Sequence, residues 1–80
     1  MKIELKLFAT LREKLPPGSK GGRAVLEVED GLTIEGLLKQ LEIAPELAQL
    51  VLVNGVSEGD SQRKLEDGDT VSIFPPVAGG

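Results

Sequence analysis

The segment AVLEVEDGLTIEGLLKQL, residues 24–41, changes its hydrophobic period part-way along. In its first half Ala24, Leu26 and Val28 alternate with Val25 and two glutamates, which is the period of a strand with one buried face. Asp30-Gly31 then supplies a turn. In the second half the apolar residues have the spacing of an amphipathic helix, and they are Ile34, Leu37, Leu38 and Leu41. A strand, a turn and a helix are therefore predicted in this order.

The predicted helix has a start signal of its own. Thr33 is placed as its N-cap, and Glu35 and Lys39 form an i,i+4 pair on the solvent side. Gly36 lies inside the helix, where glycine costs about 1 kcal/mol relative to alanine. Two explanations of Gly36 are open: close packing of the helix on a sheet, or chance composition.

Strand patterns also mark both ends of the chain. Residues 2–7 alternate between apolar and charged side chains. Near the other end, an Asp67-Gly68 turn leads into the run Thr70-Val71-Ser72-Ile73-Phe74. Between these strands, residues 51–53 form a short apolar run that stops at Asn54-Gly55, the dipeptide best suited to a tight turn with positive φ. Two or three short strands are therefore expected after the helix.

The connections carry their own signals. Residues 9–15 suit one or two turns of helix, which end at the prolines that open segment 16–22. That segment is expected to be the loop of a hairpin. Pro45 suits the first position of a second short helical segment through residue 50. Residues 57–64 are polar and predicted as loop, and Leu65 follows as an isolated apolar anchor.

The length of 80 residues bounds the architecture to one domain. Because one helix cannot cover both faces of a sheet, the economical arrangement lays it across one face of a mixed sheet. This is the α+β arrangement of β-grasp, ubiquitin-like domains, in which the first and last strands run parallel side by side. The predicted organisation is a β-grasp domain at residues 1–74 and a projecting tail at residues 75–80.

The composition excludes several kinds of chemistry. The chain has no cysteine and no histidine, so no disulfide, zinc site or His-based catalytic arrangement is expected. No other metal and no cofactor are expected either. Glu27 and Glu29 are interpreted as a solvated strand face rather than a catalytic pair. The formal charge of −4 argues against nucleic acid and anionic membranes as partners. Acidic residues dominate residues 41–80, so a partner that docks there is expected to be basic.

No apolar run approaches the ~20 residues of a membrane span, and no signal peptide pattern follows Met1. A cytoplasmic protein is therefore the expectation.

The two aromatic residues are expected to lie close together. Phe8 has the parity of the charged residues in the first strand, and Phe74 has the parity of Thr70 and Ser72. If the two strands are neighbours, both rings lie on the face away from the helix and form an anchor for a protein interface. The alternative is that Phe8 leaves the strand and tucks under the following turn, while Phe74 caps an open edge of the core.

The last six residues form a distinctive strip. Pro75-Pro76 ends the strand and stiffens the path that follows. Val77-Ala78-Gly79-Gly80 then has little side-chain bulk, and the six residues reach at most ~20 Å at about 3.3–3.6 Å each. They present a carboxylate that a partner can convert to an acyl-adenylate, open to sulfur or nitrogen nucleophiles. A flexible end or a truncated chain would have the same sequence.

The chain resembles the MoaD/ThiS family of ubiquitin-like sulfur carriers, and within it the small subunits of molybdopterin synthase. The match covers the whole chain, although segment 16–22 is longer than in common members. Its motifs are Phe8-Ala9-Thr10-Leu11-Arg12-Glu13, Val53-Asn54-Gly55, Leu65-Glu66-Asp67-Gly68-Asp69-Thr70-Val71 and Phe74-Pro75-Pro76-Val77-Ala78-Gly79-Gly80.

The resemblance implies a mechanism in which catalytic side chains belong to partners, so that the chain is not an enzyme on its own. An E1-like adenylating enzyme of the MoeB type would adenylate Gly80, next to Gly79. A persulfide donor would supply sulfur to give a thiocarboxylate. The tail would then enter a molybdopterin synthase large subunit of the MoaE type. Phe8, Phe74 and residues 75–78 would contact these partners.

Other readings stay open beside this one. The chain can instead be a carrier for thiazole or another thiolated product, a protein modifier joined to lysines through Gly80, or a plain interaction domain. Arg12 and Glu13 match the family, but they are interpreted only as an ion pair on a helix surface.

Overall fold

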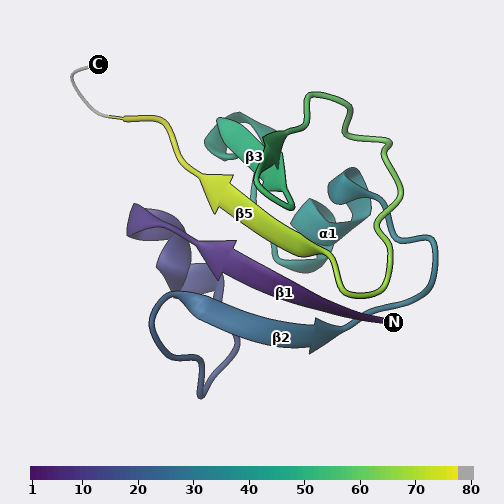
Figure 1. Cartoon of the computed structure of the whole chain (residues 1–80). Coiled ribbons are helices and arrows are strands. Elements are labelled where there is room, and N and C mark those ends of the chain that lie inside the picture. Colours follow the sequence, from purple (N-terminus) through teal and green to yellow (C-terminus); the bar gives the residue numbers. More distant parts are fainter. Residues whose placement is uncertain (78–80) are drawn as a thin grey trace.

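The computed structural model describes residues 1–77, which form a five-stranded sheet with one α-helix across one face (Figure 1). This is the β-grasp fold that the sequence predicts. The strands are β1 (Lys2–Leu7), β2 (Arg23–Glu27), β3 (Leu50–Val53), β4 (Val56–Ser57) and β5 (Thr70–Phe74). The helix is α1 (Ile34–Gln40), and two short 3-10 helices are η1 (Ala9–Lys14) and η2 (Pro45–Leu47). Within the described residues, none of the helices has the length and apolarity needed to cross a bilayer.

The first and last strands lie at the centre of the sheet, in the order β2-β1-β5-β3-β4. Strand β1 runs parallel to β5, with Leu5 beside Val71 and Leu7 beside Ile73, and this parallel pairing confirms the prediction. The neighbours β2 and β3 pair antiparallel to β1 and β5. The C-terminal ends of β1 and β5 therefore lie next to each other at the same end of the sheet.

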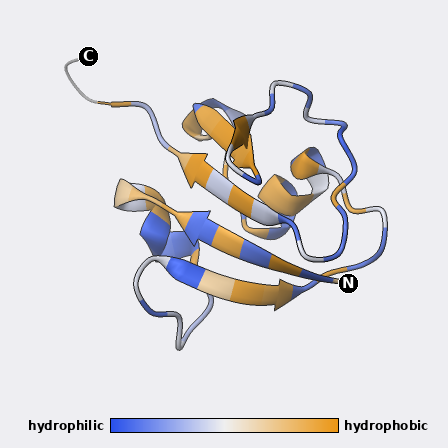
Figure 2. Ribbon diagram, in the orientation of Figure 1, coloured by the Kyte–Doolittle hydropathy of each residue, from blue (hydrophilic) through white to orange (hydrophobic). Residues whose placement is uncertain are grey.

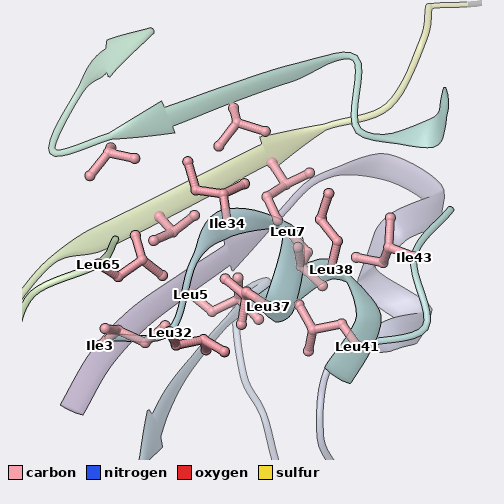
Figure 3. Packing of buried hydrophobic residues seen from close by; sticks show 14 of the residues in the cluster. Ile3, Leu5, Leu7, Leu32, Ile34, Leu37, Leu38, Leu41, Ile43 and Leu65 are labelled. Carbon is pink, nitrogen blue, oxygen red and sulfur yellow. The ribbon is translucent and has the colours of Figure 1, made fainter. Parts of the chain in front are cut away.

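The core lies between α1 and the inner face of the sheet (Figure 3). On β1 the buried side chains alternate with polar ones, and Ile3, Leu5 and Leu7 are at most 1% exposed. Figure 2 shows the same alternation as bands of opposite hydropathy along the strand. Leu37 on α1 is fully buried against them, and Leu65 is the buried anchor that the sequence predicts. The apolar side chains of the alternating strand and of the amphipathic helix, both predicted from the sequence, therefore form one core.

Helix α1 begins as predicted. The Thr33 hydroxyl oxygen accepts a hydrogen bond from the Gly36 backbone N–H at 3.1 Å, and Lys39 pairs with Glu35 at 3.3 Å. Gly36 is tightly enclosed, because a Cβ there would lie 2.8 Å from the Leu32 Cδ1 atom. The nearest atoms belong to Leu32 and Thr33, so the enclosure of Gly36 comes from the segment that leads into α1.

The short elements differ from their predictions in three places. The helix at residues 9–15 is a 3-10 helix that ends at Lys14. The second helical segment ends at Leu47 instead of residue 50, because Leu50 pairs with Phe74 and opens β3. The loop predicted from residue 57 begins one residue later, because Ser57 belongs to β4, which pairs with β3 across the Asn54-Gly55 turn. In the last two cases the sheet pairing takes residues whose local sequence preference is weak.

One buried carboxylate ties this turn to the start of β5. Asn54 has a positive φ of 53°, and its side-chain N–H donates to an oxygen of Asp69 at 2.8 Å. The other Asp69 oxygen accepts from the Glu66 backbone N–H at 2.8 Å, and Asp69 is only 6% exposed. The side-chain amide oxygen of Asn54 accepts from the Thr70 backbone N–H at 2.9 Å, which completes the link.

The substitution Asp69→Ala is expected to lower the free energy of unfolding by about 1–3 kcal/mol, because it leaves the Asn54 amide and the Glu66 N–H without their acceptor. Urea denaturation measures this loss. Glu66→Ala is the matched control, since the Glu66 side chain is exposed and accepts no hydrogen bond within residues 1–77. Equal losses in the two variants would show that the link contributes nothing specific.

Candidate functional site

Two aromatic rings are stacked on the sheet face opposite α1. The ring centroids of Phe8 and Phe74 lie 4.1 Å apart, and their planes differ by 9°. Both side chains are half-buried. The prediction that these two rings lie together is therefore confirmed, and we call them the aromatic pair.

The backbone of the central strands positions the pair. In the parallel register Leu7 lies beside Ile73, so the next residue on each strand brings Phe8 next to Phe74. The Phe8 N–H donates to the Ile73 carbonyl at 3.3 Å, which extends the pairing past the end of β1. Phe8 also precedes η1, as the alternative required, but its backbone stays extended with φ −119° and ψ 151°. Its ring therefore keeps the parity of the strand.

The structure adds Leu50 to this surface. Leu50 on β3 lies directly opposite Phe74 in the antiparallel register, and its side chain is 40% exposed. Residues opposite each other in such a pair project from the same face of the sheet. The sequence reasoning missed Leu50 by placing it in a helix, although it shares the parity of Leu52 and Phe74. We call Phe8, Phe74 and Leu50 the outer-face strip.

The chain leaves the sheet beside this strip. Strand β5 ends at Phe74, and the yellow segment that follows leads away from the sheet (Figure 1). Pro75 is half-buried, Pro76 is exposed, and Val77 is 82% exposed. The remaining predicted site residues, Ala78, Gly79 and Gly80, lie outside the described residues.

The acidic side chains contribute no metal site to this surface within the described residues. Within residues 1–77 no three Asp or Glu side chains are close enough to hold a metal ion together. Glu27 and Glu29 are both exposed, as expected for a solvated face. The geometry therefore offers an apolar contact surface at the point where the chain departs.

A sequence model of the ThiS family matches residues 5–80. The chain belongs to the ThiS family. This is a family of ubiquitin-like sulfur carriers and modifiers, and the match includes both members of the aromatic pair.

Relatives of this ThiS family chain include two Haloferax volcanii proteins. Small archaeal modifier protein 3 from Haloferax volcanii is 38% identical over 96 aligned positions, with 100% of both chains covered. The solution structure of the Haloferax volcanii HVO 2177 protein has a TM-score of 0.76 and 35% identity, covering 100% of this chain and 87% of that one.

A third similarity shows the shared fold alone. It is to a chain in a complex of subunits 1 and 2 of molybdopterin-converting factor from Helicobacter pylori, with a TM-score of 0.61, 22% identity and full coverage of both chains.

Proposed function

We propose that this protein is a sulfur carrier for molybdopterin biosynthesis that acts through the carboxylate of Gly80. An E1-like enzyme uses ATP to convert that carboxylate to an acyl-adenylate, with release of pyrophosphate. The terminal sulfur of a persulfide donor then displaces AMP, and a thiol cleaves the resulting S–S bond to leave a thiocarboxylate. The reacting carbonyl belongs to Gly80, which follows Gly79, so no side chain on these two residues hinders the nucleophiles.

The observation that supports the proposal is the aromatic pair, which lies where the Pro75-Pro76 segment leaves the sheet. An anchor at this place would hold a partner beside the segment that leads to the proposed reacting end. Half-buried aromatic side chains suit this role, because they bury a large apolar area at a small cost in conformational entropy. We propose that the partners held in this way are the adenylating enzyme and, afterwards, a large synthase subunit. The second partner is supported by the Helicobacter pylori complex of two subunits, one of which shares this fold.

A second function is favoured by one observation. The relative that is 38% identical over its full length is described as a modifier protein. In a modifier the same activated carbonyl would be attacked by a lysine amine, giving an amide bond to the target protein.

The intact mass of the chain distinguishes the two functions after co-expression with an E1-like enzyme and a sulfur source. For the sulfur carrier we expect one terminal oxygen to be replaced by sulfur. An amide-linked adduct without any thiocarboxylate would instead support the modifier. If the mass is unchanged in every condition, the carrier and modifier functions are both wrong and a plain interaction domain remains. The same mass shows whether Gly80 is the last residue of the active product, as the proposal requires.

A further inference from the structure

A second surface feature adjoins the aromatic pair. Three cationic side chains, Lys6, Arg12 and Arg23, line a surface hollow of about 270 Å³ together with Phe8 and the Gly21-Gly22 backbone. No carboxylate lines this hollow. We call these three side chains the cationic patch.

The sheet register places two of these charges against each other. Lys6 on β1 lies directly opposite Arg23 on β2 in the antiparallel pair, so the two side chains share the outer face. Like charges opposite each other in a sheet destabilise the fold. The stability of the fold therefore does not explain why two like charges are paired here. Binding of an anionic group from another molecule would explain it.

Within residues 1–77 no carboxylate lies within ion-pair distance of the patch. The ion pairs in this part of the chain are Met1–Asp30, Glu35–Lys39 and Glu58–Arg63. Glu4 lies on the same face, two residues before Lys6 on β1, but it is beyond ion-pair distance of the cations.

Arg12 reaches the patch from η1. The interpretation of Arg12 and Glu13 as an ion pair is wrong, because the two form none in the described chain. The guanidinium instead lies over Gly22, where a Cβ would come within 3.1 Å of the Arg12 Nε atom and of the Leu7 carbonyl oxygen. Gly22 also has a positive φ of 75°, so a side chain at this position would be both strained and in contact with Arg12.

We propose that the cationic patch binds an acidic segment of the protein partner that engages the aromatic pair. The inference rests on the proposed function, and it names the charge that the partner must carry beside its apolar contact. An acidic protein segment fits better than a nucleic acid, because the chain has a net charge of −4 and the patch holds only three cations beside an aromatic surface.

Arg23→Glu is the variant that tests this proposal, with Lys64→Glu as its matched control. Both change the net charge equally, and Lys64 is exposed near Thr33, at the start of α1 and away from the patch. Arg23→Glu places an opposite charge beside Lys6, so the melting temperature is not expected to fall. In pyrophosphate exchange with the E1-like enzyme of the same genome, we expect the KM for the Arg23→Glu protein to rise about tenfold at low salt.

The control and the salt dependence decide the outcome of this assay. Lys64→Glu is expected to change the KM less than about twofold, and added salt is expected to weaken the wild-type interaction more than that of Arg23→Glu. Equal effects of the two substitutions, or no effect of either, would overturn the proposal while leaving the sulfur carrier function intact.

A second measurement is independent of that function. In an amide NMR titration with a hexaglutamate peptide, the shifts are expected at Lys6, Gly22 and Arg23, and they are expected to be absent with hexaglutamine or in Arg23→Glu. Shifts spread evenly over the surface, or tighter binding of a single-stranded oligonucleotide at the same residues, would contradict an acidic protein partner. If the wild type supports no pyrophosphate exchange at all, the proposed function is wrong. The titration still shows whether the cationic patch binds an acidic segment.

Discussion

Deletion of Gly79 and Gly80 is expected to abolish thiocarboxylate formation while leaving the melting temperature almost unchanged. The loss is complete because the proposed reacting carbonyl is removed. The fold is spared because none of the core residues of the described chain lies beyond Ile73, and β5 ends at Phe74. Intact mass after incubation with the adenylating enzyme, ATP and a sulfur source measures the first effect, and circular dichroism on heating measures the second.

Two matched variants sharpen this experiment. Adding a single serine after Gly80 keeps both glycines but moves the carboxylate, and it is expected to abolish thiocarboxylate formation as well. Val25→Ala changes an exposed side chain on β2 and is expected to leave it intact. A large fall in melting temperature on deletion would show that the glycines belong to the globule. Sulfur transfer that survives the deletion would show that Gly80 is not the reacting residue.

The main elements of the fold could be predicted because each depends on a local pattern. The alternation in residues 2–7 and the helical spacing from Ile34 to Leu41 are both properties of a few neighbouring residues, and the structure uses them as the two sides of one core. The parallel pairing of β1 and β5 then followed from having one helix to cover one face. Capping by Thr33 was equally local and is confirmed.

The features that escaped prediction depend on contacts between distant segments. Leu50 is assigned to β3 by its pairing with Phe74, which no local pattern around Pro45 reveals. The enclosure of Gly36 by Leu32 depends on the path of the chain into α1. The strand β4 is too short to show a period of its own.

The candidate site divides in the same way. The aromatic pair could be predicted because parity and one topological assumption were enough to bring Phe8 and Phe74 together. The cationic patch could not be predicted, because the opposition of Lys6 and Arg23 depends on the register across a long loop. Arg12 was assigned to an ion pair with its neighbour, since the sequence does not show the path that brings Gly22 beneath it.

Phe74→Ala is expected to weaken binding to the E1-like enzyme far more than it weakens folding. A buried aromatic anchor at the centre of an interface contributes about 2–4 kcal/mol, which is roughly a 30- to 1000-fold increase in Kd. The loss in folding stability is expected to be about 1–2 kcal/mol, because Phe74 is only half-buried and lies outside the core. Calorimetric titration measures the Kd, and urea denaturation measures the stability.

The comparison with a second exposed apolar residue makes this ranking specific. Val25 is 69% exposed and lies opposite Glu4 on the same sheet face, but outside the outer-face strip. Val25→Ala is therefore expected to change the Kd less than about twofold, in line with the near-neutral residues of most interfaces. If Phe74→Ala instead destabilises the fold by more than it weakens binding, the aromatic pair is a lid on the core, and the anchor for the partner must lie elsewhere on the sheet.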